Sequence, residues 1–274
     1  MGKLEGKVAF ITGAARGQGR SHAVRLAREG ADIIAVDLCR QIDSVAYPLA
    51  SPADLAETVA QVEALDRRIV SAQADVREIG ALREAVAEGV GQLGGVDIVL
   101  ANAGILGVST DAGADQDRLF RDVVDVNLTG VWNTVSAAAP IMIEQGRGGA
   151  IVLTSSTQGL TGRGGDGGGA LSGYAAAKHG VVGLMRSFSH WLAPHNIRVN
   201  TVHPTGVNTD MIVNEVIPKV FEAQPEMAQA LSNLMPVEMI EAIDISNAIA
   251  WLVSDEARYV TGITLPVDAG FTVK

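Results

Sequence analysis

Two side chains capable of acid–base chemistry, Tyr174 and Lys178, stand four residues apart in the segment Tyr-Ala-Ala-Ala-Lys. The pattern over Gly173–Leu192 predicts a helix, and residues four apart lie on one helix face. A free tyrosine has a pKa of about 10 and is a poor base at neutral pH. Because a neighbouring ammonium favours the phenolate, we expect Lys178 to lower the pKa of Tyr174. The pair therefore predicts proton transfer to or from a substrate oxygen.

Two further polar positions can join this pair. Ser155 and Ser156 follow the apolar run Ala150–Thr154, which predicts a strand, and a hydroxyl there can hydrogen-bond a substrate oxygen. Asn127 lies inside the predicted helix Ala114–Ile143, although asparagine is a mediocre helix former. The segment Leu-Ala-Asn-Ala-Gly at residues 100–104 ends another strand with residues suited to a close ligand.

A glycine-rich turn spans residues 12–19, Thr-Gly-Ala-Ala-Arg-Gly-Gln-Gly. It follows the predicted strand Val8–Thr12 directly and opens the predicted helix Ser21–Glu29. Glycine suits a tight turn that a pyrophosphate must approach closely, and the helix N-terminus offers unpaired N–H groups to an anion. The strand–turn–helix context therefore predicts a dinucleotide site.

The preference between dinucleotides depends on two charged residues. Asp37 follows the second predicted strand, 18 residues beyond Gly19, where an acid binds the adenosine ribose hydroxyls. Its carboxylate would repel a 2′-phosphate, which favours NAD over NADP. Arg16 points the other way, because a basic residue there could meet that phosphate. We give Asp37 priority and expect Arg16 to face solvent.

These residues are set in a regular alternation of short apolar runs and amphipathic stretches. The predicted strands are Val8–Thr12, Asp32–Val36, Arg68–Ala72, Ile98–Ala101, Ala150–Thr154, Ile197–Val202 and Ile263–Val267. The predicted helices are Ser21–Glu29, Pro52–Asp66, Ile79–Gln92, Ala114–Ile143, Gly173–Leu192 and Ile243–Ser254. This alternation predicts an α/β fold with a parallel sheet and helices on both faces. Since no linker divides the chain, we expect one domain over residues 1–274.

Three segments interrupt the alternation: residues 38–52 after the second strand, the glycine-rich run Gly162–Gly169, and residues 208–238. The last contains three prolines and is expected to form short helices or a mobile loop, in the position of a substrate lid. The apolar residues of this lid region, with Met239 just beyond its end, are Met211, Ile212, Val213, Val216, Ile217, Val220, Phe221, Met227, Leu231, Leu234, Met235 and Met239. Flexible methionines make such a surface adaptable, which favours a hydrophobic substrate.

Composition excludes several classes of protein. The 274 residues carry a net charge of −10 with no dense basic run, so nucleic acid and anionic membranes are poor partners. The single cysteine, Cys39, cannot form an internal disulfide and offers too few ligands for zinc, and we expect no metal. No signal peptide or membrane span is apparent, which predicts a cytoplasmic protein.

The combination of these motifs in this order resembles the short-chain dehydrogenase/reductase family over about residues 3–271. The resemblance implies a Rossmann fold, a doubly wound sheet of seven parallel strands. It implies a catalytic tetrad of Asn127, Ser156, Tyr174 and Lys178, with Ser156 a better match than Ser155 although it lies 18 rather than 13 residues before the tyrosine. The residues implied to bind NAD are Gly13, Arg16, Gly17, Gln18, Gly19, Asp37, Leu38, Asp75, Val76, Asn102, Ala103, Gly104, Tyr174, Lys178, Pro204, Thr205, Gly206, Val207, Thr209 and Met211.

Within the tetrad, the resemblance implies that Tyr174 is the general base in oxidation and the general acid in reduction. Lys178 would bind the nicotinamide ribose, Ser156 would position the substrate oxygen, and Asn127 would hold a water that continues the proton path. His203, beside Pro204, is expected to be structural, because the tetrad already supplies the acid and base.

A closer resemblance is to the mycofactocin-coupled, carveol-dehydrogenase-like subfamily, carried by residues 13–27 and 36–55. It implies NAD that does not exchange, a separate redox carrier, and a terpenoid- or sterol-like secondary alcohol or ketone. Family members are commonly homotetramers built on the two long helices. The alternatives are an ordinary reductase with exchangeable NAD(P), such as a 3-ketoacyl reductase, a lyase or epimerase on the same scaffold, and a non-catalytic dinucleotide sensor.

Overall fold

Parallel strands form one seven-stranded sheet in the computed structural model, which describes residues 2–109, 111 and 113–274. The order across the sheet is β3-β2-β1-β4-β5-β6-β7. The strands are β1 (Val8–Thr12), β2 (Asp32–Asp37), β3 (Ile69–Gln73), β4 (Ile98–Ala101), β5 (Gly149–Thr154), β6 (Ile197–Pro204) and β7 (Thr264–Val267). The predicted fold class and all seven strands are confirmed, with strand ends that differ from the predicted ones by at most two residues.

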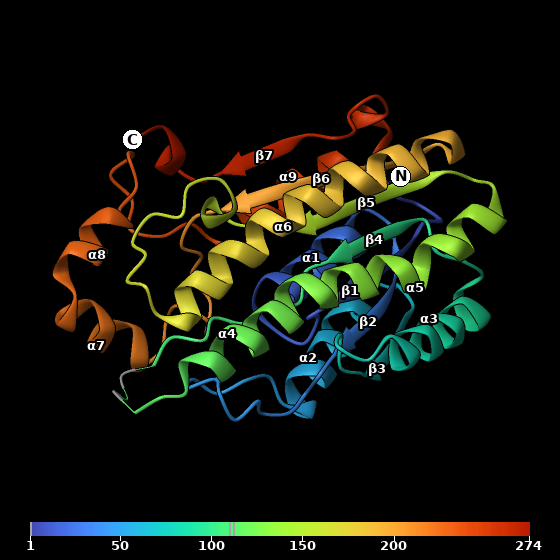
Figure 1. Ribbon diagram of the computed structural model, residues 1–274. Coiled ribbons are helices and arrows are strands. Elements are labelled where there is room, and N and C mark those ends of the chain that lie inside the picture. Colours follow the sequence, from blue (N-terminus) through green and yellow to red (C-terminus); the bar gives the residue numbers. More distant parts are fainter. Residues whose placement is uncertain (1, 110, 112) are drawn as a thin grey trace.

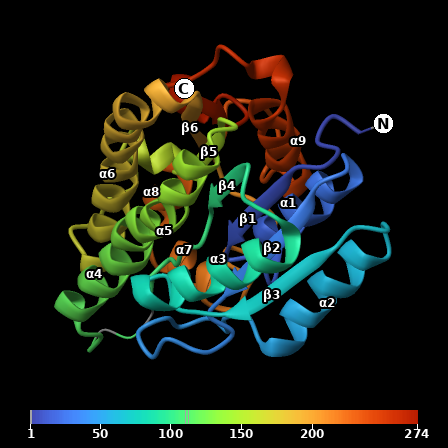
Figure 2. The same cartoon turned by 90° about the vertical axis from the view of Figure 1, so that its right-hand side faces the viewer.

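Helices cover both faces of this sheet (Figures 1 and 2). On one face lie α1 (Gly17–Arg28), α2 (Pro52–Glu63) and α9 (Ala242–Val253), which pack together. On the other lie α3 (Ile79–Leu93), α4 (Gln116–Val124), α5 (Gly130–Gln145) and α6 (Gly169–Leu192). Each face buries its own apolar core, as expected for a sheet whose strands are apolar on both sides.

Local sequence explains several of the element ends. At the start of α2, the Ser51 hydroxyl accepts a hydrogen bond from the Asp54 backbone N–H while the Asp54 carboxylate accepts from the Ser51 N–H. Pro52 stands in the first turn, where its missing N–H is not needed. This capping box fixes where the long connection after β2 ends and α2 begins.

One predicted helix is divided in the structure. The single helix expected over Ala114–Ile143 is instead α4 and α5 joined by a π-helical turn, Asp125–Thr129. The wider turn places the side chain of Asn127, which is fully buried, toward the body of the protein. Residues 208–238 form the short helices α7 (Val216–Ala223) and α8 (Pro225–Ala230), as one of the two expectations for this segment.

The carboxyl ends of the strands point to one end of the molecule, where α7 and α8 also lie (Figure 1). In open α/β sheets, ligands bind outside these ends, where the strand order reverses direction. Here that place lies between β1 and β4. In the described part of the chain, no helix is long and apolar enough to cross a membrane, and no three His, Cys, Asp or Glu side chains group around a possible metal position.

Candidate active site

The glycine-rich turn between β1 and α1 has a shape that only small residues allow. Gly17 has φ of +54°, a left-handed conformation that glycine adopts without strain. A Cβ on Gly19 would lie 1.9 Å from the carbonyl oxygen of Gly13. The first turn of α1 can therefore pack against the loop, and its free N–H groups face a cavity. This is the geometry that a bound diphosphate requires.

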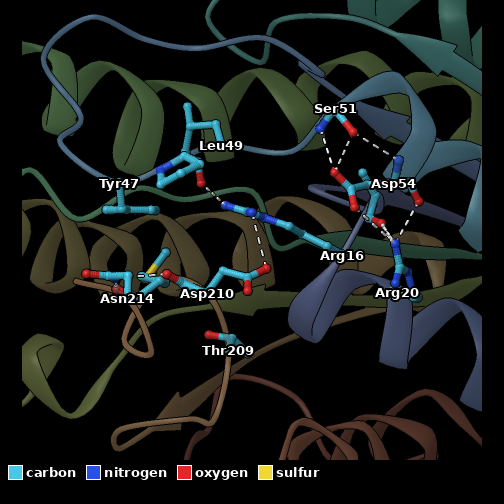
Figure 3. Close-up of polar contacts among 12 residues, drawn as sticks. Arg16, Arg20, Tyr47, Leu49, Ser51, Asp54, Thr209, Asp210 and Asn214 are labelled. Carbon is cyan, nitrogen blue, oxygen red and sulfur yellow. Dashed lines mark hydrogen bonds and ion pairs between the residues drawn. The ribbon is translucent and has the colours of Figure 1, made fainter. Parts of the chain in front are cut away.

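Arg20 anchors this turn to α2, a role that was not predicted from the sequence. Its guanidinium donates to the Ala15 carbonyl at 2.6 Å and to the Asp54 carbonyl at 2.8 Å (Figure 3). Its Nε also donates to the Thr58 hydroxyl at 3.0 Å. The arginine thus ties the loop to α2. The signal in the sequence was only a basic residue one turn into α1.

Asp37 and Asp75 stand at the ends of neighbouring strands and both line the cavity. The Asp37 carboxylate accepts from the Ala15 N–H at 3.0 Å and from the Cys39 N–H at 3.2 Å, which fixes its position beside the loop. Burial opposes the charge of Asp75, but the hydrogen bonds of Arg77, at 2.6–3.1 Å, hold the pKa of Asp75 below its usual value. Both groups are therefore available as fixed carboxylates.

The cavity beside the loop has a volume of about 150 Å³. The predicted cofactor residues that line it are Gly13, Arg16, Gly17, Gln18, Gly19, Asp37, Leu38, Asp75, Val76, Asn102, Ala103, Gly104, Thr209 and Met211. We call it the cofactor cavity. The structure thus brings together residues from five separate segments that the sequence analysis had linked only by motif.

Residues 38–51, which follow β2, fold over this cavity and add a wall that includes Ile42, Tyr47, Leu49 and Ala50. Gln41 organises the segment: its side-chain amide donates to the Val45 carbonyl at 2.7 Å and accepts from the Leu49 N–H at 2.9 Å. Tyr47 is buried, and its hydroxyl accepts from the Leu106 N–H at 3.1 Å. We call residues 38–51 the insertion. Tyr47 was not predicted, because nothing local marks which of its residues turns inward.

Ser156, Tyr174 and Lys178 converge beyond the far end of the cofactor cavity. The Lys178 ammonium donates to the Thr154 carbonyl at 2.7 Å and lies 5.6 Å from the centre of the Tyr174 ring. Both serines line the cavity in front of Tyr174, but the Ser155 hydroxyl donates to the Lys178 carbonyl at 2.8 Å, whereas the Ser156 hydroxyl hydrogen-bonds Tyr174. This arrangement agrees with the choice of Ser156 over Ser155 as the candidate catalytic serine.

The charge states in this group follow from its burial. Burial raises the pKa of Tyr174, and the hydrogen bond of the Ser156 hydroxyl opposes that rise only in part. Burial also lowers the pKa of Lys178 to about 8. The lowered pKa that was expected for Tyr174 is therefore wrong for the chain by itself: removal of the phenol from water outweighs the hydrogen bond from Ser156.

Asn127 and His203 hold neighbouring backbone in place. The Asn127 amide makes two 2.8 Å hydrogen bonds with the backbone N–H and carbonyl of Ile105, and it lines neither cavity. His203 is fully buried between the Ser156 carbonyl and the Thr201 hydroxyl, each at 2.8 Å. Burial lowers the pKa of His203, so a neutral ring positions the backbone of Ser156.

A second, larger cavity of about 810 Å³ opens in front of Ser156 and Tyr174. We call it the substrate cavity. Its apolar lining comes largely from residues 208–238, including Met211, Ile212, Val213, Ile217, Phe221, Leu231 and Met235, and from the adjoining Met239. Arg163 and Gly164, from the glycine-rich run, line it as well. Val216, Val220, Met227 and Leu234, also apolar residues of that segment, do not line it.

The two cavities adjoin each other. The predicted residues Pro204, Thr205, Gly206 and Val207 line the substrate cavity. Five residues line both cavities: Gln18, Asn102, Gly104, Thr209 and Met211. The Thr205 hydroxyl donates to the Asn233 side-chain oxygen at 2.7 Å, which ties the strand end to the segment after α8. One elongated ligand can therefore extend from the glycine-rich turn to Tyr174.

Arg16 does not face solvent as expected. Its guanidinium donates to the Pro48 carbonyl of the insertion and lies 3.2 Å from the Asp210 carboxylate (Figure 3). The expectation was wrong because both partners come from irregular segments whose course the sequence does not reveal. With both partners engaged, Arg16 is held between them rather than free to meet a 2′-phosphate.

Comparisons with known proteins agree with this geometry. Residues 7–218 match the model of the family described as short chain dehydrogenase. The chain is 58% identical to an uncharacterized oxidoreductase of Mycobacterium tuberculosis, over 99% of this chain and 98% of that one. It is 48% identical to the (−)-trans-carveol dehydrogenase of Rhodococcus erythropolis, over the whole of both chains.

Among solved structures, the carveol dehydrogenase of Mycobacterium avium in complex with NAD superimposes with a TM-score of 0.92. It is 51% identical in sequence and is matched over the full length of both chains. The family resemblance drawn from the sequence motifs is thereby confirmed. The chain belongs to the short-chain dehydrogenase/reductase family.

Proposed function

We propose that the protein is an NAD-dependent oxidoreductase that interconverts a hydrophobic secondary alcohol and its ketone. The observation that carries the proposal is the convergence of Ser156, Tyr174 and Lys178 where the apolar substrate cavity meets the cofactor cavity. A catalytic tyrosine, a cation and a hydroxyl thus face one position that both a dinucleotide and an alcohol can reach. The carveol dehydrogenases of R. erythropolis and M. avium support the same class of reaction.

The residues of the cofactor cavity fit NAD. Gly17 and Gly19 let the first turn of α1 pack closely against the loop, so that its N-terminus borders the cavity where a diphosphate would bind. The Asp37 carboxylate is fixed where it can accept from ribose hydroxyls. Asp37 also carries a charge that opposes a 2′-phosphate. NAD, when bound, supplies a nicotinamide C4 that accepts hydride from a carbinol carbon or returns it to a carbonyl.

The chain's own residues then handle the proton and the substrate oxygen. Ser156 donates a hydrogen bond to the substrate oxygen and holds it beside Tyr174. The Tyr174 oxygen takes the hydroxyl proton during oxidation and gives it back during reduction. The ammonium of Lys178, held by the Thr154 carbonyl, stabilises negative charge on the tyrosine. Asn127 has the part implied by the family resemblance: it supports a water that links Lys178 to solvent.

The first test replaces Tyr174 by phenylalanine. Tyr174→Phe should still bind NADH, because the ring remains, but its alcohol oxidation rate should fall by about 10²-fold or more, the usual contribution of general acid–base catalysis. His179→Ala, one residue beyond Lys178 and exposed, is the matched control on the same helix. Turnover in Tyr174→Phe close to that of the unaltered protein would remove tyrosine from the mechanism.

The substrate cavity argues for a bulky apolar alcohol of terpenoid or sterol type. Met211, Ile217, Phe221 and Leu231 surround the space in front of Ser156, and methionine adapts to irregular shapes. We propose that residues 208–238 act as the lid of this cavity and that the chain acts as one catalytic unit. Rates measured on a series of cyclic secondary alcohols of increasing size test this; preference for short linear alcohols would contradict it.

We further propose that NAD stays bound between turnovers and passes its electrons to a separate redox carrier of the mycofactocin type. The insertion supports this, because Ile42, Tyr47 and Leu49 wall the cofactor cavity. The test is to release and identify nucleotide from the purified protein, then to compare alcohol oxidation with added NAD and with an artificial electron acceptor. Brisk turnover of added NAD would instead favour an ordinary dehydrogenase with exchangeable cofactor.

The assembly and location are proposals as well. Phe120, Trp132 and Trp191 are each at least 40% exposed on α4, α5 and α6, and large exposed aromatic side chains favour contact with another subunit. They support a homotetramer, which light scattering on the purified protein tests directly. The cytoplasmic location is a separate proposal, which cell fractionation tests. A monomer in solution would contradict the assembly.

A further inference from the structure

Three segments that are far apart in the sequence meet at the mouth of the cofactor cavity. They are the glycine-rich turn with Arg16, the insertion with Tyr47 to Ala50, and the start of the lid with Thr209 to Met211; all three line the cavity. Figure 3 shows the Arg16 side chain reaching from its turn between the insertion and Asp210. One side chain therefore connects all three walls.

The contacts of Arg16 are made with opposite ends of its guanidinium. Nη2 donates to the Pro48 carbonyl, and Nη1 lies 3.2 Å from Asp210 Oδ2. Beside them the walls already touch, because a Cβ on Gly17 would lie 3.3 Å from the methyl carbon of Thr209. The arginine side chain is only 21% exposed. It is thus packed in the mouth rather than extended from the surface.

Both partners of Arg16 are anchored in their own segments. On the insertion, Gln41 donates to the Tyr47 carbonyl at 3.2 Å, next to Pro48. On the lid, the Asn214 amide donates to the Asp210 carbonyl at 2.9 Å, and its oxygen accepts from the N-terminus of α7. Pro48 therefore cannot move without the rest of the insertion, and Asp210 cannot move without the start of the lid. The Arg16 contacts thus join two ordered segments.

We propose that Arg16 is the clasp of the cofactor cavity: by joining Pro48 of the insertion to Asp210 of the lid, it sets how fast NAD enters and leaves. The proposal rests on the proposed function, since it requires that NAD occupies the cofactor cavity. It adds that retention of NAD depends on a specific pair of contacts and not on the insertion alone. Arg16 is a positioning residue in this account, and it takes no part in hydride or proton transfer.

Substitution of Asp210 distinguishes the clasp from a simple contact between Arg16 and the phosphates, because the two models predict opposite changes in the rate of NAD release. If Arg16 only attracted the diphosphate, removing the nearby Asp210 carboxylate would reduce repulsion of the phosphates and slow NAD release. If the two residues form a clasp, Asp210→Ala should speed both NAD binding and release. Because an exposed ion pair is weak, we expect about threefold for Asp210→Ala and about tenfold for Arg16→Ala, which loses both contacts.

The measurement is stopped-flow fluorescence of NADH binding and of its displacement by excess NAD, with thermal melting as a check on folding. The double variant Arg16→Ala/Asp210→Ala should release NADH no faster than Arg16→Ala, since their shared contact is already lost. Arg67→Ala is the matched control: Arg67 is 29% exposed, joins Glu5 at 2.9 Å and the Gly30 carbonyl, and lines neither cavity. It should leave both rates unchanged.

The outcomes are distinct. If the unaltered protein binds no NADH and also releases no nucleotide on denaturation, the proposed function is wrong and this inference with it. If it binds NADH but Asp210→Ala releases it at the same rate or more slowly, the clasp is wrong while the proposed function stands. Faster binding and release in Asp210→Ala, absent in Arg67→Ala, would establish the clasp.

Discussion

His22 should make the protein sensitive to acid in a way that one substitution removes. This histidine lies on α1 under the cofactor turn and is fully buried, with Nδ1 2.7 Å from the Ser246 hydroxyl of α9. Burial lowers the pKa of His22 from 6.5 to about 3. Between these values the unfolded chain binds a proton at this residue and the folded chain does not, so the free energy of unfolding falls as the pH falls from about 6.5 toward 3.

The size of the effect follows from the same values. Each pH unit in that range is worth about 1.4 kcal/mol, so at pH 5, about 1.5 units below the unfolded pKa, His22 should lower the free energy of unfolding by about 2 kcal/mol. The assay is urea unfolding followed by tryptophan fluorescence at pH 7.5 and pH 5. His22→Asn can still face the Ser246 hydroxyl but cannot titrate, so it should lose about 2 kcal/mol less than the unaltered protein between the two pH values.

His195 is the matched control, because it is exposed at the surface. His195→Asn should leave the difference between the two pH values as it is in the unaltered protein. The constant cost of filling the His22 position with a smaller side chain cancels, since it is present at both pH values. If His22→Asn loses as much stability on acidification as the unaltered protein does, burial of a neutral His22 is refuted.

Three further predictions concern the site. Gly19→Ala should abolish NADH binding in a fluorescence titration, because its Cβ would lie 1.9 Å from a backbone oxygen, whereas Gly183→Ala, with open space around it on α6, should raise the unfolding free energy by up to about 1 kcal/mol. Asp37→Ala should narrow the preference for NAD over NADP, measured as the ratio of the two dissociation constants; an unchanged ratio would contradict the role of its carboxylate. Because burial raises the pKa of Tyr174, the rate of alcohol oxidation should rise with pH above neutrality and that of ketone reduction should fall, and a pH–rate profile without this opposition would argue against tyrosine as the proton carrier.

The site residues that the sequence predicted well are those whose positions depend on local secondary structure. The conformations of Gly17 and Gly19 follow from a turn between a strand and a helix, and Tyr174 and Lys178 are neighbours because helix geometry puts them on one face. Asp37 is fixed by its place at a strand end. Each of these positions is set by an element whose pattern spans only a few residues.

The features that the sequence did not predict depend mainly on irregular segments, whose apolar residues follow no helical or strand period. Arg16 was expected in solvent because its partners, Pro48 and Asp210, lie in the insertion and the lid start. Tyr47 reaches its buried place for the same reason. The π-helical turn at Asn127 breaks a helix whose apolar pattern is continuous, so periodicity alone could not reveal it.

The direction of the Tyr174 pKa shift shows how the apolar substrate cavity and the Tyr174–Lys178 pair constrain each other. An apolar cavity is what a hydrophobic alcohol requires, yet the same removal of water raises the pKa of Tyr174 and lowers that of Lys178 to about 8. Both shifts disfavour the charged pair that proton abstraction needs. The protein offsets this with fixed partners, a serine hydroxyl on the tyrosine and the Thr154 carbonyl on the lysine. A substitution that admits water beside Tyr174 should therefore lower the pKa of Tyr174 and make its phenolate easier to form. The same substitution should weaken binding of a hydrophobic substrate, so the oxidation rate at neutral pH should rise while the affinity for the substrate falls.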